Sequence, residues 1–144
     1  MSLINKNLNV SFHYIALLAL SFSLLTAPLH AQSYTNATTY YEQGRSFMTQ
    51  EDWYAAVEAL LECLRLNSAH AEATAAIAEC YYELAEFDQA LLWVRKARGL
   101  ARGNLALANL EAFTLIALGR LENAASIISD VLAREPYNRE ALFA

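Results

Sequence analysis

One pattern of residues recurs three times along this chain, each time 34 residues further on. It is clearest in the stretch LGRLENAASIISDVLAREP at residues 118–136. The matched positions are Trp53, Ala56, Leu60 and Cys63 in the first copy, Phe87, Ala90, Val94 and Ala97 in the second, and Leu121, Ala124, Ile128 and Val131 in the third. Self-similarity at a fixed period is typical of repeat proteins, in which each copy is a small structural unit packed on its neighbours.

The sequence from Tyr40 onward is helical in character. Alanine, leucine and glutamate dominate, Pro136 is the only proline, and apolar or small residues recur at spacings of three and four. Such spacing places them on one face of a helix. Turn-like stretches divide each copy into two helices of about 12–15 residues, which are marginal alone and need tertiary packing.

This unit of two helices resembles the tetratricopeptide repeat, because its residues occupy the signature places of that family. The first helix carries a small residue at Gly44, Ala78 and Ala112. The residue three positions later is Phe47, Tyr81 or, less faithfully, Leu115. The turn residue is Trp53, Phe87 or Leu121, the small residue of the second helix is Ala56, Ala90 or Ala124, and the residue seven further on is Cys63, Ala97 or the larger Val131.

The resemblance implies an all-α fold, a right-handed α-solenoid of tandem helix-turn-helix hairpins. Three full repeats are expected at residues 37–70, 71–104 and 105–138. Residues 139–144 begin a fourth repeat or form a truncated cap.

A physical reason for the pattern holds without the family name. Two helices cross closely only where a small side chain faces a large one, because protein interiors are close-packed. Gly44 and Ala56 are expected to form such a notch, which Phe47 and Trp53 fill.

The first residues differ in kind from the repeats. Lys6 is the only charged residue before Glu42, and residues 14–25 form an apolar run of the length found in secretory signals. We expect a signal peptide over residues 1–31, cleaved after Ala31, and a short linker over residues 32–36. The protein would then be exported by a bacterium and be periplasmic or secreted. The alternative is an uncleaved N-terminal membrane anchor.

The charge balance argues against a nucleic-acid partner. Ten Lys and Arg stand against fifteen Asp and Glu, a net charge of −5, whereas phosphate-backbone binding relies on clustered cations. The run RKAR at residues 95–98 is interpreted as the charged last turn of a helix, where cations are favoured.

The residues offer little for catalysis. His70 is the only histidine after the predicted signal peptide, and we expect it to be a solvated loop residue. A Ser-His-Asp, Cys-His or His-metal arrangement is therefore not expected. No catalytic residue, metal site or cofactor is predicted, and the chain is interpreted as a non-enzyme.

The two cysteines leave two alternatives open. Cys63 and Cys80 both fall at small, inward-facing repeat positions on helices that should pack together. In an oxidising compartment they are a candidate disulfide, which would close a loop of about 17 residues and contribute on the order of 3 kcal/mol. Otherwise they are two reduced core cysteines.

The resemblance also implies where a partner binds, because the first helices of such repeats line a concave groove. Aromatic side chains there would grip apolar residues of a peptide or helix, and glutamates would favour neighbouring Lys or Arg. The predicted groove residues are Tyr41, Arg45, Met48, Glu72, Glu79, Tyr82, Glu83, Asn109 and Phe113.

One subclass of the family clamps the C-terminal carboxylate of chaperones with a lysine and an asparagine from the first unit and cations from the third. Here Tyr41 and Arg45 occupy the first two places, and Ala106 and Leu110 stand where the third unit's cations should be. Carboxylate capture by that arrangement is not expected.

The function predicted from these features is a non-enzymatic scaffold that binds a peptide or helix of a partner protein within an envelope-associated assembly. The alternative is a carrier of a small apolar ligand or a transport accessory protein, which a cavity between Tyr41, Tyr82 and Phe113 would indicate. The last full helix predicts either a longer chain or self-association through its C-terminal apolar face. That face carries Ile127, Ile128, Val131 and Leu132.

Overall fold

The computed structural model of the chain describes residues 36–144. The predicted signal peptide, with its cleavage point at Ala31, and linker residues 32–35 lie outside the described residues. Asn36, predicted as the last linker residue, is helical. No helix within the described range is both long and apolar enough to cross a membrane.

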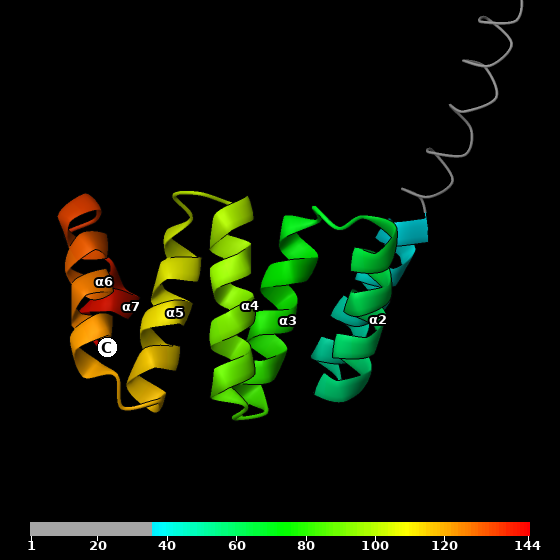
Figure 1. Cartoon of the computed structure of the whole chain (residues 1–144), viewed down its shortest axis with the longest axis horizontal. Coiled ribbons are helices and arrows are strands. Elements are labelled where there is room, and N and C mark those ends of the chain that lie inside the picture. The colour runs from blue at the N-terminus through cyan, green and yellow to red at the C-terminus, as the bar shows by residue number, and fades with distance from the viewer. Residues whose placement is uncertain (1–35) are drawn as a thin grey trace, which may run out of the picture. The chain divides into compact units, whose positions relative to one another are not determined.

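The described part of the chain is built from helices alone, as the sequence predicted. Residues 36–49 are helical and pair with α2 (Trp53–Leu66). The remaining helices are α3 (Ala71–Glu83), α4 (Phe87–Leu100), α5 (Leu105–Ala117), α6 (Leu121–Arg134) and the short α7 (Arg139–Leu142). Helices α2 to α6 lie side by side in chain order (Figure 1), and each of them contacts the next.

The turn inside each hairpin repeats the same backbone geometry. Glu51, Ala85 and Gly119 have positive φ angles of 59°, 57° and 71°. The next residue in each turn donates its N–H back to a helix carbonyl at the same register, from Asp52 to Phe47, from Glu86 to Tyr81 and from Arg120 to Leu115. A left-handed residue followed by this backward bond is a common way to end a helix. The 34-residue period is therefore a period of the backbone as well as of the sequence.

The start of the first helix of each later unit is also periodic. Asn104 accepts hydrogen bonds from the N–H groups of Ala106 and Leu107, and Asn138 accepts one from Ala141. His70, at the equivalent place, accepts one from Ala73 through Nδ1 at 3.3 Å. The expectation of a solvated loop histidine was therefore wrong, because His70 is a half-buried helix cap.

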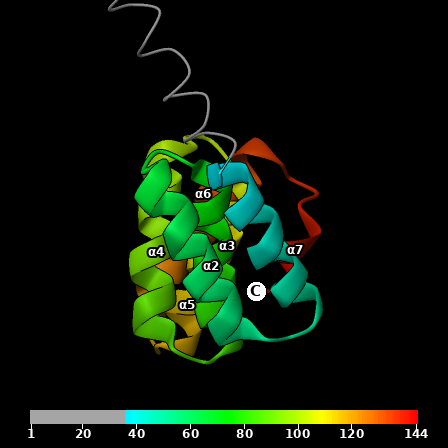
Figure 2. The same cartoon turned by 90° about the vertical axis from the view of Figure 1, so that its right-hand side faces the viewer.

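A notch forms at Gly44 in the first hairpin, but the side chain nearest to it is that of Leu60 on α2, and not Phe47 or Trp53 as predicted. A Cβ atom added to Gly44 would lie 2.6 Å from Cγ of Leu60 and 3.4 Å from the carbonyl oxygen of Ala56. Ala78 and Ala112 are likewise buried at the equivalent places of the later hairpins. The view along the row of helices (Figure 2) shows the 36–49 helix lying against α2. The small residue of the first helix is therefore buried in all three units.

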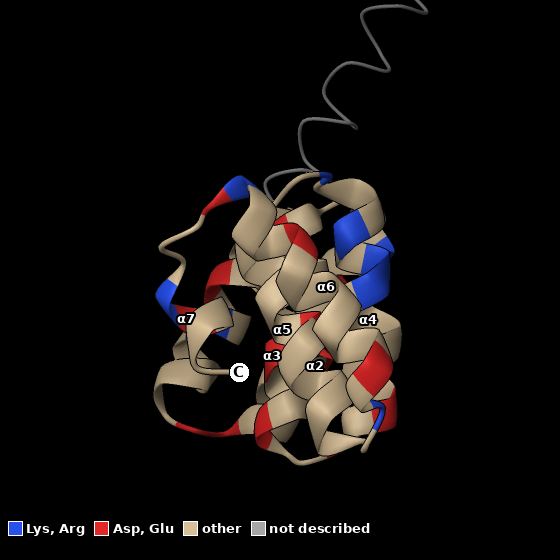
Figure 3. Ribbon diagram, turned by 90° about the vertical axis from the view of Figure 1, so that its left-hand side faces the viewer, with Lys and Arg blue, Asp and Glu red and all other residues tan. Residues whose placement is uncertain are grey.

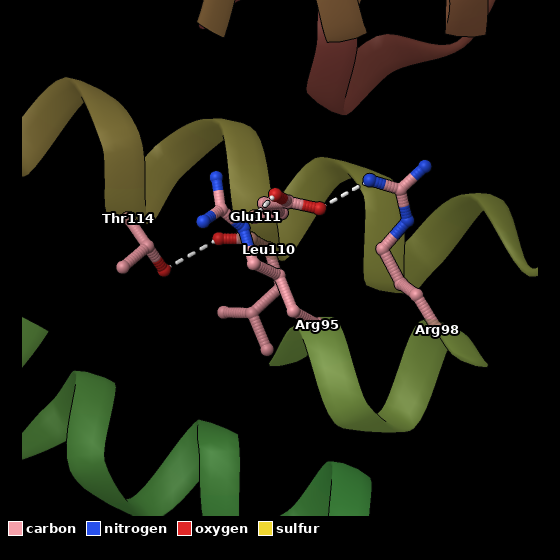
Figure 4. Close-up of polar contacts among 5 residues, drawn as sticks. All are labelled: Arg95, Arg98, Leu110, Glu111 and Thr114. Atoms are coloured by element: carbon pink, nitrogen blue, oxygen red, sulfur yellow. Dashed lines mark hydrogen bonds and ion pairs between the residues drawn. The ribbon is translucent and has the colours of Figure 1, made fainter. Parts of the chain in front are cut away.

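An ion-pair cluster fastens the third unit to the second. Glu111 on α5 is almost completely buried, and its carboxylate accepts hydrogen bonds from Arg95, at 2.7 Å, and from Arg98, both on α4. Figure 4 shows the two guanidinium groups on either side of this carboxylate. A buried carboxylate requires such partners, because an unpaired buried charge is strongly unfavourable.

The C-terminal end of the described chain is partly covered by α7. Ala141 of α7 is buried in a small cluster with Ala108 and Val131, and Ile127, Ile128 and Leu132 pack against it. Val131 is therefore not part of an open apolar face. Leu121 at the start of α6 stays 61% exposed, and self-association through this end of the chain remains a prediction.

Candidate functional site

Three consecutive units contribute to a hollow with a volume of about 230 Å³. Its walls come from the 36–49 helix, from α3, and from the start of α5 with the loop before it. The lining residues are Tyr41, Arg45, Ala71, Glu72, Ala75, Ala76, Glu79, Ala101, Asn104 and Leu107. The small alanines of α3 leave room for a ligand between the charged and aromatic side chains. We call this feature the first-helix hollow.

The charges in this hollow are one cation and two carboxylates. Arg45 comes from the first unit, and Glu72 and Glu79 come from α3. The residue Glu79 is exposed to solvent as a whole, but the protein atoms around its carboxyl group partly desolvate it and so raise its pKa. The charge of Arg45 opposes this increase in the pKa, and the charge of Glu83 adds to it. A carboxylate in such surroundings gains from a cationic partner.

Tyr41 lines the hollow and packs against His70, which lies behind it. Their rings lie 4.9 Å apart, at an interplanar angle of 33°. Burial raises the pKa of Tyr41, which Arg45 opposes, so its phenol is neutral at physiological pH and can donate a hydrogen bond. His70 Nδ1 lies 3.1 Å from the Glu72 carboxylate while it caps α3.

The structure brings together only four of the nine predicted groove residues in this hollow, namely Tyr41, Arg45, Glu72 and Glu79. Met48 is half-buried against the first core cluster. Tyr82 makes an edge-on contact with Phe87 at 5.6 Å, and it is half-buried like Phe113. Glu83 is exposed near the end of α3 and acts on Glu79 through its charge.

Asn109 departs most from the expectation of an exposed groove residue. It is 3% exposed, and its Nδ2 donates to Asn138, at 3.0 Å, and to Glu140, at 2.7 Å. On α5, the side chain of Asn109 faces α7 and the segment that precedes α7. Residues that follow the third unit therefore cover Asn109. Among the described residues, no donor reaches its Oδ1 atom.

Some residues of the hollow were not predicted from the sequence. Leu107 lies in the first turn of α5, Asn104 is the N-cap of that helix, and Ala101 is the C-cap of α4. A signal for Asn104 existed, because an asparagine or histidine recurs at residues 36, 70, 104 and 138. The period marks it as a helix cap but does not reveal that the loop before α5 reaches the wall of a hollow shared with the first unit.

The two cysteines are free thiols in this structure. Both are fully buried in the first core cluster, and burial raises the pKa of Cys63 and, to about 12, that of Cys80. The structure places both thiols unjoined in the core, and a disulfide between them in an oxidising compartment stays a prediction. Residues 36–144 also contain no group of three or more His, Cys, Asp or Glu side chains arranged to hold a metal ion.

Comparison with known proteins gives structural neighbours only. No protein-family model and no curated protein sequence matches the chain. The tetratricopeptide-repeat (TPR) domain of Arabidopsis OM64 superposes with a TM-score of 0.72 at 25% identity, over 77% of this chain and 92% of that one.

Two further neighbours are complexes with peptides. The first TPR of Spaghetti (RPAP3), bound to the HSP90 peptide SRMEEVD, gives a TM-score of 0.71 at 23% identity, over 76% of this chain and 86% of that one. The TPR2B domain of yeast Sti1 in its pHsp70 complex gives 0.66 at 20% identity, over 70% and 81% of the two chains. Together with the 34-residue period of the turns, helix caps and small buried residues, these likenesses establish that the chain folds as a tetratricopeptide-repeat protein, an α-solenoid of three helical hairpins and the start of a fourth.

Proposed function

We propose that this protein is a non-enzymatic interaction scaffold that binds a segment of a partner protein in the first-helix hollow. The observation that carries the proposal is the composition of the hollow, with Tyr41, Glu72 and Glu79 around alanine-lined space. The RPAP3 and Sti1 neighbours, which are complexes with HSP90 and HSP70 peptides, support a peptide as the ligand.

The charges of the hollow favour a partner segment that carries Lys or Arg beside an apolar residue. Two carboxylates face one guanidinium group there, so a basic side chain finds more complementary charge than an acidic one. The peptide in the RPAP3 complex, SRMEEVD, is rich in carboxylates. Because Tyr41 and Arg45 stand in the places where carboxylate-binding relatives are expected to carry lysine and asparagine, we propose a different charge preference for this chain.

The carrier alternative receives less support. The first-helix hollow contains Tyr41, but neither Tyr82 nor Phe113 lines it. Its volume of about 230 Å³ is also below the roughly 300–1,000 Å³ usual for small-molecule cavities. An open hollow with alternating charged and small residues fits the side chains of a peptide better than an enclosed apolar molecule.

Charge reversal in the hollow should change the peptide preference. We expect Glu72→Lys/Glu79→Lys to weaken binding of a Lys- and Leu-containing heptapeptide at least about tenfold, because like charges placed together at an interface cost several kcal/mol. Fluorescence anisotropy with that peptide, a Glu- and Leu-containing peptide of equal length and SRMEEVD would measure the change. Glu122→Lys, an exposed site on α6, is the matched control. Preferential binding of the acidic peptides by the wild-type chain would contradict the proposal.

The same titration has a second readout in its pH dependence. A bound cation favours ionised Glu79, so binding releases a proton wherever Glu79 is protonated beforehand. Affinity for the basic peptide is therefore full above the raised pKa of Glu79 and declines as the pH falls through it, in the range above 4.5. Glu79→Gln should remove most of this decline. A hydrophobic contact alone would show no such dependence.

We further propose that the protein is exported from a bacterial cytoplasm and acts in an envelope-associated assembly. The support is the apolar run at residues 14–25, preceded by Lys6 and followed by small Ala31. We expect the mature protein in the periplasmic or secreted fraction to begin at Gln32, as N-terminal sequencing would show. Retention of the full-length chain in the membrane fraction would instead support the uncleaved anchor.

A further inference from the structure

A second hollow lies at the junction of the second and third units and gathers three arginines. Its volume is about 300 Å³. Arg98 comes from the last turn of α4, Arg102 from the loop before α5, and Arg134 from the last turn of α6. Residues separated by up to 36 positions in the sequence thus share one site in a chain whose net charge is −5. Figure 3 shows the blue Lys and Arg segments gathered along the end of α4.

Arg98 is held in place by its partner on α5. One terminal nitrogen of its guanidinium group donates to Glu111, and the other points away from that carboxylate (Figure 4). A guanidinium group has five N–H donors, so Arg98 keeps donors for a second acceptor. The ion pair with nearly buried Glu111 therefore holds the Arg98 side chain in place and still leaves N–H donors free to bind an anion.

The other two arginines have no partner in the described part of the chain. Neither Arg102 nor Arg134 forms an ion pair there, and both are exposed. One carboxylate, that of Asp130, lines a smaller adjoining hollow together with Arg98 and Arg134. The three guanidinium groups outnumber the two carboxylates, those of Glu111 and Asp130, so the site carries a net positive charge.

The helix ends explain only part of this cluster. A cation is favoured in the last turn of any helix, which explains why α4 has Arg98 and why α6 has Arg134. It does not account for Arg102 in the loop. At the equivalent junction between the first and second units, Leu64, Ser68 and Leu100 take the three places, so the arginines are not part of the repeat pattern.

The shape of the hollow leaves an anion room to approach. Cβ atoms added to Gly99 or Gly103, two of its wall residues, would meet nothing within 4 Å. The start of α5 forms another part of the wall at Leu105, and the N-terminal end of a helix carries a positive partial charge. A tetrahedral dianion offers one oxygen to each guanidinium group, the geometry for which arginine is suited.

We propose that this junction is a binding site for the phosphate group of a small phosphorylated molecule. The site is separate in function from the first-helix hollow, which has the opposite charge balance, although Asn104 lines both. Binding of a phosphate here would connect α4, α6 and the loop before α5, and so stabilise the junction between the second and third units.

The test uses the full chain and inorganic pyrophosphate as the probe. We expect saturable binding by isothermal titration calorimetry in low salt, with backbone amide shifts in NMR spectra confined to residues 98–108 and the end of α6. Arg102→Ala and Arg134→Ala should each weaken binding about tenfold, or ~1.4 kcal/mol, the loss expected for one charge-assisted contact. Arg139→Ala, an exposed arginine outside this hollow, is the matched control and should change affinity less than twofold.

A second arm separates the sources of the phosphate group. Vesicles of phosphatidylcholine with phosphatidic acid are compared with vesicles of phosphatidylcholine alone, using the wild-type chain and Arg102→Ala/Arg134→Ala. Binding of soluble pyrophosphate without vesicle binding supports a small soluble ligand, and arginine-dependent binding to the phosphatidic acid vesicles assigns the phosphate to a lipid headgroup. The proposal is overturned if pyrophosphate does not bind, or if all three single variants respond equally, because the effect is then one of net charge alone.

Discussion

Arg95→Ala/Arg98→Ala should lower the free energy of unfolding by about 3 kcal/mol, since it leaves nearly buried Glu111 without a counter-charge. The carboxylate side chain of Glu111 is 5% exposed, whereas the side chains of Arg95 and Arg98 are 53% and 39% exposed. The loss of stability therefore depends on which partner of the ion pair is removed. Removing the carboxylate frees two arginines that water can solvate, but removing the arginines strands a charge inside the protein.

Two variants make this expectation a comparison within one protein. Glu111→Leu should lose about 1 kcal/mol or less, because an apolar residue of similar size often replaces a buried ion pair at little cost. Arg65→Ala breaks the exposed pair with Glu62 and should leave the free energy of unfolding nearly unchanged, because solvent screens an exposed ion pair. Urea unfolding followed by circular dichroism measures all three. A larger loss for Glu111→Leu than for the double arginine variant would contradict the account of Glu111.

Hydrogen exchange would locate the effect of the double variant. In repeat proteins each unit is stabilised through its interfaces with the neighbouring units. The ion pairs join α4 to α5, so amide protection in α5 and α6 should fall further than in α2 and α3. Uniform loss of protection along the chain would mean that the cluster contributes to the stability of the whole chain and not to this junction.

Gly44→Ala should destabilise the wild-type chain by about 1–3 kcal/mol, as overpacking of a core usually does. The added methyl group would lie 2.6 Å from Cγ of Leu60, a side chain that is itself fully buried and has little room to move. Leu60→Ala alone should lose about 2–5 kcal/mol through the cavity that it leaves.

The sign of the glycine substitution should reverse when both changes are combined. In the Leu60→Ala background the clash is gone, and alanine is favoured over glycine in a helix by about 1 kcal/mol. Gly44→Ala should then stabilise the chain. Gly99→Ala on α4 is the control, because a Cβ atom there meets nothing within 4 Å, so it should stabilise both backgrounds equally. Thermal unfolding of the four combinations measures the coupling, and simple additivity would exclude the notch at Gly44.

The candidate site was predicted less well than the fold, and particular residues show why. Tyr41, Arg45, Glu72 and Glu79 meet in one hollow as expected, because they lie on the first helices of adjacent units. Asn109 lies on a first helix too, yet α7 and the segment before it bury it. Position within the repeat indicates which helix a residue belongs to, but the residues packed over that helix decide its exposure.

The sequence by itself determined the period, the hairpins and the small buried positions, but not that Leu60 packs against Gly44. Each of these depends on residues within one unit or its neighbour, and the same pattern recurs at every 34 residues. Only the tertiary structure decided which charges meet. Glu111 reaches back to α4, Arg134 joins Arg98 and Arg102 across the last unit, and His70 caps a helix beside Tyr41. The physical reason is that periodicity fixes the face of a helix, whereas contacts between long polar side chains depend on how helices cross and on which partners can satisfy a buried charge.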